Sequence, residues 1–390
     1  MKRVIQYILA TSLLAGTIIG AGIFSLPYVF TRAGITLSFF YLALASFAFI
    51  VVHLFYAEIV AKDNASHRFV GYTRNYLGRG AGVLALIMTV LQMFVVLAIY
   101  LVLSVSFLQL IFPQFPPIYS VLLFWACGSL AIFLSVKRVA LLEALITGGI
   151  IAVIAIIFFL AFQKEGGIHM RFSPVHPGYA FLPLAPLLFS LAGRPAIPTM
   201  LGYSRIVNNN GVSRRFLRRA IIIGTAIPAI VYAMFVFGII GLSSQVSQDA
   251  ISGISSEVRS GLLFAIGILG ALSLWSSYLV IGVDVKQILQ YDLRFSSHTR
   301  SLAVIGIPFA IYFLSNQNFL GLVGIAGGFF LALEGIFIIL MWRKSRGQDS
   351  EKAVILIPRY AKLCAGVAFC VFLLALLGEV LGMTGVLPKP

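Results

Sequence analysis

The chain has 390 residues, of which 60% are hydrophobic and only 10% are charged, with 28 Lys and Arg against 12 Asp and Glu. A soluble domain carries roughly 25% charged residues, and the apolar excess here cannot be hidden in a water-soluble core, so most of the chain must face lipid. The basic residues lie in short segments between apolar runs, which argues against a nucleic-acid-binding patch. We therefore expect a lipid bilayer and no nucleic acid as partner.

Eleven apolar segments are predicted to be membrane helices, because a helix needs about 20 residues to cross the bilayer core. The first begins directly after Met1-Lys2-Arg3 and continues past Pro27 with no clear cleavage site, so it is interpreted as a retained helix and not as a signal peptide. The ninth is the shortest. In chain order the segments cover residues 5–31, 35–61, 81–112, 118–136, 139–162, 177–203, 216–242, 260–289, 302–314, 319–342 and 360–381.

Lys and Arg residues alternate between the two sides of these segments. With the N-terminus inside, all of them lie on the inner side except Arg194, which is within a span, and the outer residues Arg32, Lys164, Arg171, Arg259 and Lys389. The positive-inside rule then predicts a cytoplasmic N-terminus and a periplasmic or extracellular C-terminus in the inner (plasma) membrane. No connection is long enough for a soluble domain, so a single membrane domain is expected.

The sequence lacks the motifs of disulfide frameworks, metal sites, membrane enzymes and channels. Cys127, Cys364 and Cys370 are scattered and form no CxxC pair, which argues against a disulfide framework or a metal site. There is no HExxH motif or Ser/His/Asp set for an enzyme, and no repeated filter or charge ring for a channel. We expect no enzyme activity, no cofactor, and no metal beyond a possible Na⁺.

Two of the predicted helices contain helix-breaking sequences near their middle. The first span contains GTIIGAGIFSLP from Gly16 to Pro27, and the sixth contains FSLAGRPAIP from Phe189 to Pro198. Proline removes a backbone donor and clashes with the preceding turn, while glycine removes the steric bias towards helix. Gly and Pro are also common in ordinary membrane helices, so one such span would be weak evidence.

The pair of breaks predicts a binding site. Unwound backbone is tolerated within a membrane only where it lines a cavity or is buried in protein. Half-helix N-termini offer N–H groups to an anion and half-helix C-termini offer carbonyls to a cation, and an amino acid zwitterion needs both. The two spans open the first and the second five helices, which is typical of a transporter built from inverted repeats.

Ionisable side chains within the spans are further candidates, because they are costly in lipid and usually face the bundle interior. Arg194, in the sixth-span break, would bind a substrate carboxylate, replace a coupling cation or close a gate, unless it snorkels to an interface. The candidates for gating or proton relay are His53, Glu58, Asp284 and Glu334. Glu58 and Asp284 would either pair with inner Arg or Lys as part of a gate or be plain interfacial carboxylates. His53 is compatible with a proton relay and with a structural, hydrogen-bonded histidine.

GTIIGAGIFSLP resembles the first-helix signature of the amino acid–polyamine–organocation superfamily. It is most similar to the aromatic amino acid (tryptophan/tyrosine) permeases and the related amino acid/auxin permeases. The segment from Phe189 to Pro198 resembles the sixth-helix break of that branch, and Ser276-Ser277-Tyr278-Leu279 resembles its eighth helix. The resemblance implies an all-α fold of two five-helix inverted repeats (5–162 and 177–342), with discontinuous helices 1 and 6 and an extra helix at 360–381.

The resemblance also implies site residues. The substrate carboxylate would lie near the backbone N–H groups that follow Gly20, and the ammonium near carbonyls of both breaks. A cation site would combine backbone carbonyls of the first helix with hydroxyls of the eighth, although small hydroxyl residues also simply allow close helix packing. A second sodium site is not expected, because it needs Asn where this chain has Ile23. The substrate set is Ile18, Gly20, Ala21, Gly22, Ile23, Phe189, Ser190 and Gly193, and the cation set is Gly16, Ile19, Ser273, Ser276 and Ser277. Two further substrate candidates come from the residues themselves: Tyr100 on the third span, and Arg194, which departs from the small or uncharged residue usual in the sixth-helix break.

The expected function is import of amino acids by alternating access, coupled to H⁺ or Na⁺, by a monomer. The preference for aromatic substrates is implied by the family resemblance alone. The alternative is a membrane sensor of the germinant-receptor kind on the same scaffold, which would bind an amino acid without moving it.

Overall fold

The computed structural model describes residues 2–62, 67–133, 139–163, 175–207, 213–243, 245–254, 258–348 and 358–387. Within these ranges the chain is helical and contains no strand. The elements are α1 (Lys2–Ile18), η1 (Ala21–Ser25), α2 (Leu26–Ala33), α3 (Ile35–Lys62), α4 (Phe69–Leu77), α5 (Arg79–Ile111), α6 (Pro117–Phe133), α7 (Val139–Gln163), η2 (Pro177–Tyr179), α8 (Leu184–Leu191), η3 (Arg194–Ala196), α9 (Ile197–Val207), α10 (Arg214–Leu242), η4 (Ser252–Ile254), α11 (Ser260–Tyr291), α12 (Ser297–Leu314), α13 (Phe319–Gly324), η5 (Ile325–Leu331), α14 (Ala332–Gln348) and α15 (Pro358–Met383).

Each predicted span corresponds to helix in the described residues. Eight helical segments are long and apolar enough to cross a membrane, and the bent pair Val4–Ile18 and Ala21–Ala33 makes a ninth. The fourth and ninth predicted spans are helices too, but α6 is a shorter apolar helix and α12 is not among the candidate spans. The count of eleven crossings therefore stays a prediction. Residues 134–136 of the fourth span, and Lys164, Arg171 and Lys389, lie outside the described residues.

Two features differ from the prediction. The connection between the second and third spans contains a short helix, α4, whose Phe69 and Tyr72 are buried against the bundle. The tenth span is not a uniform α-helix, because its middle part, η5, is a π-helix. Single π turns occur mainly within α-helices at functional sites.

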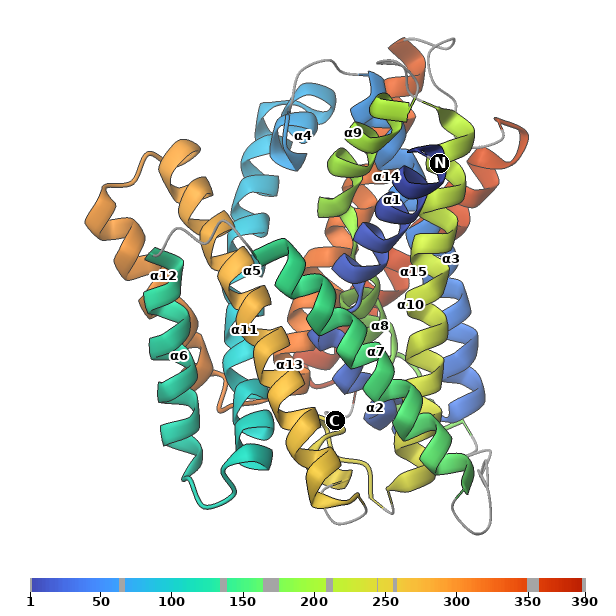
Figure 1. Cartoon of the computed structure of the whole chain (residues 1–390). Coiled ribbons are helices and arrows are strands. Elements are labelled where there is room, and N and C mark those ends of the chain that lie inside the picture. The colour runs from blue at the N-terminus through green and yellow to red at the C-terminus, as the bar shows by residue number, and fades with distance from the viewer. Residues whose placement is uncertain are drawn as a thin grey trace.

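The helices form one bundle with the broken spans at its centre (Figure 1). The two broken spans run in opposite directions, so that α1 and α9 share the end of the molecule that holds the N-terminus, while α2 and α8 share the other end. The contacts agree, because α1 packs against α9 and α10, and η1 packs against α8. The long helices α5 and α11 pack along each other beside this centre.

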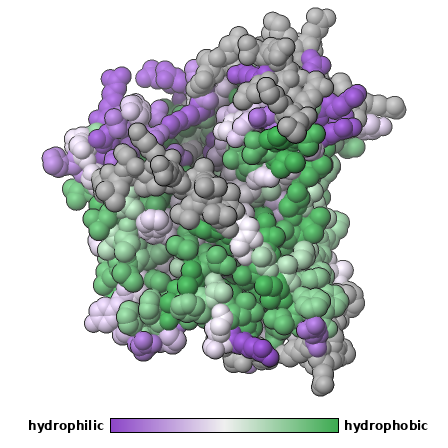
Figure 2. All heavy atoms as spheres, viewed as in Figure 1, coloured by the Kyte–Doolittle hydropathy of each residue, from purple (hydrophilic) through white to green (hydrophobic). Residues whose placement is uncertain are grey.

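The surface is that of a membrane protein. Hydrophobic side chains cover the middle of the visible face, and hydrophilic ones gather mainly at the end where the N-terminus lies (Figure 2). Large apolar side chains such as Leu130 and Ile230 are 69% and 62% exposed. A soluble protein rarely exposes a continuous apolar belt, so the prediction of a multi-span membrane protein is confirmed.

The π-helix packs closely against the broken sixth span. A Cβ atom added to Gly327 would overlap the carbonyl oxygen of Ala185 and would lie 3.0 Å from the backbone nitrogen of Phe189. One added to Gly328 would lie 2.9 Å from the Ala185 Cβ atom. Only glycine permits this backbone-to-backbone approach, so η5 and α8 form a tightly packed pair behind the break.

This contact predicts a large stability difference between two glycines. Gly327→Ala should destabilise the protein by about 1–3 kcal/mol through overpacking and lower the midpoint of thermal unfolding in detergent. Gly366→Ala on α15, where an added Cβ meets nothing within 4 Å, is the control and should leave the midpoint unchanged or raise it. Equal midpoints for the two variants would show that η5 and α8 are not closely packed.

Candidate functional site

The first span is interrupted between α1 and η1. Helix α1 ends at Ile18, Gly20 has an extended backbone (φ −149°, ψ −158°), and the chain resumes as the 3₁₀-helix η1. The axes on the two sides of the break differ by 45°. The start of a helix leaves its first N–H groups without intrahelical partners, so Ala21 and Gly22 provide the predicted anion-facing end. This break is confirmed.

The sixth span is interrupted after α8. Helix α8 ends at Leu191, Ala192 is extended (φ −70°, ψ 118°), and the chain resumes at η3 and α9. The N–H of Gly193 donates to Nε2 of His53 at 3.2 Å, and Nδ1 of the same ring lies 3.3 Å from Oγ1 of Thr225. Accepting from Gly193 requires an unprotonated Nε2, so Nδ1 donates to Thr225 in the neutral ring. His53 thus supports the break structurally.

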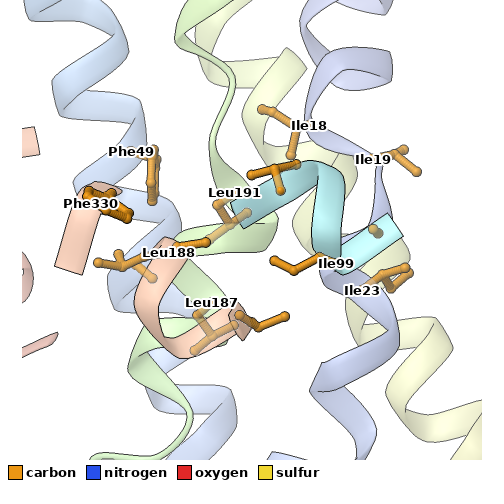
Figure 3. Close-up of a cluster of buried hydrophobic side chains, with 14 of the residues drawn as sticks. Ile18, Ile19, Ile23, Phe49, Ile99, Leu187, Leu188, Leu191 and Phe330 are labelled. Carbon is orange, nitrogen blue, oxygen red and sulfur yellow. The ribbon is translucent and has the colours of Figure 1, made fainter. Parts of the chain in front are cut away.

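The two breaks lie directly against each other. An added Cβ on Gly22 would lie 2.6 Å from the Ser190 Cα atom, and one on Gly193 would lie 2.6 Å from Cγ1 of Ile18. Figure 3 shows Leu187, Leu188 and Leu191 of α8 between Phe49 and Phe330 on one side and the isoleucines of the first break on the other. The apolar packing therefore holds two stretches of irregular backbone in one place.

Tyr232 of α10 joins the two breaks by hydrogen bonds. Its hydroxyl lies 2.7 Å from the carbonyl oxygen of Ile18 and 2.6 Å from that of Ser190, and the side chain is completely buried. A hydroxyl has one hydrogen, so the two carbonyls share a single donor. The sequence prediction had assigned carbonyls near these residues to the substrate ammonium; here a tyrosine occupies the pair at Ile18 and Ser190.

A cavity of about 370 Å³ lies beside the breaks. This is within the range of ~300–1,000 Å³ for small-molecule sites. Its polar lining includes Thr17, Thr89 and Gln92, and its apolar lining includes Met93, Val96, Ile146 and Ile281. The predicted residues that line it are Ile18, Gly20, Ala21, Gly22 and Phe189 from the substrate set, the further substrate candidates Tyr100 and Arg194, Gly16, Ile19, Ser273, Ser276 and Ser277 from the cation set, and Asp284 and Glu334 from the gating set.

The remaining predicted residues lie behind the cavity wall. Ile23 and Ser190 are 1% and 2% exposed, and Gly193 packs against Ile18. Glu58 is buried and lies 3.7 Å from Nε of Arg346, the basic residue at the end of α14. Glu58 thus pairs with an arginine at the contact between α3 and α14 and not in the cavity; the side of the membrane on which this contact lies stays a prediction.

Arg194 forms an ion pair with Glu334 at the edge of the cavity. Nε of Arg194 donates to Oε1 of Glu334 at 2.6 Å, and the two side chains are 16% and 9% exposed. The guanidinium carbon lies 4.6 Å from the ring centre of Phe69 on α4 and 5.9 Å from that of Tyr56 on α3. Arg194 is thus held within the bundle and does not snorkel. Asp284, on α11, lines the cavity and forms no ion pair within the described part of the chain.

The cavity is open towards the end of the molecule that holds the N-terminus. Thr17, Pro195 and Thr199 line it and are exposed, although they lie within the helix bundle. Towards the opposite end, Phe24 of η1 packs edge-to-face on Phe107 and Phe235, with ring centres 5.0 and 5.7 Å apart. These aromatic rings separate the cavity from the far end.

Several residues of the cavities and breaks were not predicted from the sequence. Thr89 and Gln92 of α5 line the cavity. The sequence could have indicated them, because they are polar residues in an otherwise apolar span. Tyr232 had no such signal, because aromatic residues are frequent throughout the chain and only the tertiary packing places its hydroxyl between two carbonyls. Glu379 on α15 was also overlooked, although it is an ionisable residue within a predicted span.

Comparison with solved structures shows the fold. MhsT in complex with L-phenylalanine is similar with a TM-score of 0.66 and 19% sequence identity, over 96% of this chain and 98% of MhsT. The Eremococcus coleocola manganese transporter, in complex with an aromatic bis-isothiourea substituted compound, is similar with a TM-score of 0.67 and 16% identity, over 98% of this chain and 88% of that chain. Mhp1, a nucleobase-cation-symport-1 family transporter, has a TM-score of 0.58 and 14% identity, over 98% of this chain and 92% of its own.

The sequence comparisons give the family. No curated protein matches the chain significantly. The model of the tryptophan/tyrosine permease family matches residues 4–380, which is nearly the whole chain. This match confirms the resemblance seen in GTIIGAGIFSLP and agrees with the transporter fold and the broken helices. The chain is therefore an amino acid transporter of the membrane, not an enzyme, and it belongs to the tryptophan/tyrosine permease family.

Proposed function

We propose that this protein imports aromatic amino acids by alternating access, with a cation gradient of H⁺ or Na⁺ as the driving force. The observation that carries the proposal is the cavity beside two adjoining helix breaks. It combines free N–H groups at the start of η1 with carbonyls of the unwound backbone. These groups complement the two charges of an amino acid zwitterion.

The walls of the cavity support an aromatic side chain on the substrate. Val96, Tyr100, Ile146, Phe189 and Ile281 give it a largely apolar face beside the polar backbone. Ligand sites of this kind bury the body of the ligand in apolar surroundings and use few polar groups for orientation. The family match favours the same substrate class.

The distribution of open and closed ends supports alternating access. The cavity is open beside Thr17 and Thr199 and closed by Phe24, Phe107 and Phe235. The protein would lie in the inner membrane of the cell. The hydrophilic end of the molecule and the alternation of Lys and Arg between the two sides favour a cytoplasmic N-terminus. On that orientation the structure is inward-facing, and the outward-facing state requires the aromatic rings to separate.

The antiparallel arrangement of the two broken spans supports two inverted repeats, 5–162 and 177–342, followed by the helix at 360–381. Coupling to Na⁺ would use Gly16, Ile19, Ser273, Ser276 and Ser277, all of which line the cavity. We also propose that the monomer is the working unit, since both helix breaks and the whole predicted cation set come together around a cavity within one chain.

Transport by purified protein in liposomes is the direct test. L-tryptophan, L-tyrosine or L-phenylalanine should accumulate inside under an inward gradient of H⁺ or Na⁺, and the accumulation should stop when the gradient is collapsed. Empty liposomes are the control. Binding of the amino acid, seen as a raised unfolding temperature, without any uptake would instead identify a sensor.

The ion pair at the cavity edge gives a second prediction. Arg194→Gln leaves the Glu334 carboxylate buried without its partner, which typically costs about 3–5 kcal/mol. We expect a lower unfolding temperature and at least about a tenfold loss of tryptophan uptake. Arg194→Gln combined with Glu334→Gln should recover stability but not uptake.

The matched control for these variants is Arg219→Gln, which changes an exposed arginine of α10. It should behave like the wild type in both measurements. If Arg194→Gln retained full uptake, Arg194 would have no part in transport.

The hydroxyl that bridges the breaks gives a third prediction. Tyr232→Phe removes the donor shared by the Ile18 and Ser190 carbonyls, which leaves buried acceptors unpaired at a cost of about 1–3 kcal/mol. Tryptophan uptake and the unfolding temperature should both fall. Tyr312→Phe, a buried tyrosine of α12 that does not line the cavity, should change neither. Equal uptake and equal unfolding temperatures of the two variants would show that the Tyr232 hydrogen bonds contribute neither to transport nor to stability.

A further inference from the structure

A second cavity lies at the opposite end of the bundle from the mouth of the first. It has a volume of about 310 Å³ and is enclosed by the start of α8, the start of α13 and the end of α15. None of its lining residues lines the cavity beside the breaks. Its lining consists of Gly178, Phe181, Leu182, Ala185, Pro186, Asn318, Leu320, Gly321, Gly324, Ile325, Gly378, Glu379, Gly382, Met383 and Leu387.

Among the described residues of this lining, Glu379 is the only one with an ionisable side chain. Its carboxylate lies against the backbone of Gly324, where an added Cβ would be 2.7 Å from Oε2 and 2.8 Å from Oε1. Within the described part of the chain it forms no hydrogen bond and no ion pair. A carboxylate in mostly apolar surroundings without a cation is costly. The site therefore has a carboxyl group without a partner, an apolar wall and space for a ligand.

The composition of the wall selects the class of ligand. An inorganic cation needs several oxygen ligands. Among the described side chains of this lining only Glu379 and Asn318 offer oxygen, and Oδ1 of Asn318 already accepts from the N–H of Gly321 at 2.9 Å, so the side chains alone do not form a cation site. An amino acid would bring a carboxylate for which the described lining has no cationic side chain. A primary amine with an apolar body matches one carboxylate beside Phe181, Leu320 and Met383.

We propose that this cavity is a binding site for small primary amines with an aromatic or aliphatic body, and that Glu379 pairs with the ammonium group. The site is additional to the substrate cavity and does not depend on the proposed direction or coupling of transport. It is comparable in volume to the substrate cavity, so a ligand such as 2-phenylethylamine is of suitable size.

The packing connects this site to the substrate cavity. An added Cβ on Gly328 would lie 2.7 Å from the Glu379 Cβ atom and 2.9 Å from the Ala185 Cβ atom, so the π-helix is clamped between α15 and α8. Gly327 in the same π-helix faces the backbone of Phe189, whose side chain lines the substrate cavity. The amine site and the substrate cavity are therefore connected through α8 and η5.

Binding of 2-phenylethylamine to the purified full-length protein tests the proposal, with saturating L-tryptophan present to fill the substrate cavity. The amine should raise the unfolding temperature of the wild type, whereas phenylacetate and 2-phenylethanol should not. Glu379→Gln should weaken amine binding at least about tenfold, and Asp292→Asn, which changes an exposed carboxylate after α11, should not.

A second variant keeps the test decisive if Glu379→Gln does not fold. Gly382 lines the cavity and an added Cβ there meets nothing within 4 Å, so Gly382→Leu fills the cavity and keeps the carboxylate. It should also weaken amine binding. The proposal is overturned if the wild type does not bind the amine, if tryptophan displaces it, or if neither variant changes the affinity. If tryptophan fails to bind or to be transported while amine binding still depends on Glu379, only the proposed transport function fails.

Discussion

Irregular backbone in the middle of a membrane is the constraint on which this structure depends. Each backbone N–H or C=O left without a partner in hydrocarbon costs several kcal/mol, yet both broken spans leave such groups around Ile18–Ala21 and Leu191–Gly193. The structure meets this cost by placing the two breaks together. His53 accepts from Gly193, and Tyr232 bonds to the carbonyls of Ile18 and Ser190. The N–H groups at the start of η1 remain beside a cavity, where a ligand can use them.

Close approach of the two breaks requires small residues on both sides. Gly22 faces Ser190, Gly193 faces Ile18, and Gly327 of the π-helix faces the backbone of α8. These contacts surround α8 on two sides, so this half-helix is held by backbone packing as well as by its leucines. Gly328 connects the same half-helix to α15, because an added Cβ there would lie 2.7 Å from the Glu379 Cβ atom and 2.9 Å from the Ala185 Cβ atom.

The charged side chains that line the two cavities are either paired with each other or without an ion-pair partner among the described residues. Arg194 and Glu334 come from different broken or irregular spans, and they neutralise each other at the cavity edge. The rings of Phe69 and Tyr56 lie near the guanidinium, with their centres 4.6 and 5.9 Å from its carbon atom. Asp284 and Glu379 lack such a partner among the described residues, and each of them faces a cavity.

The sequence by itself determined the membrane environment, the positions of most helices and the two breaks. These follow from local properties: apolar length, the distribution of Lys and Arg, and Gly and Pro near the middle of a span. The residues of the first break and Arg194 were therefore predictable, the family resemblance added the residues of the cation set, and most of these residues line the cavity. Only the tertiary structure decided which groups meet across the bundle. Tyr232 bridging Ile18 and Ser190, Arg194 pairing with Glu334, His53 bonding to Gly193, and Glu379 lying against Gly324 all join residues on different helices. The length of an apolar run predicts a membrane helix. It does not predict which helices are neighbours, because lipid-facing and protein-facing surfaces are both apolar.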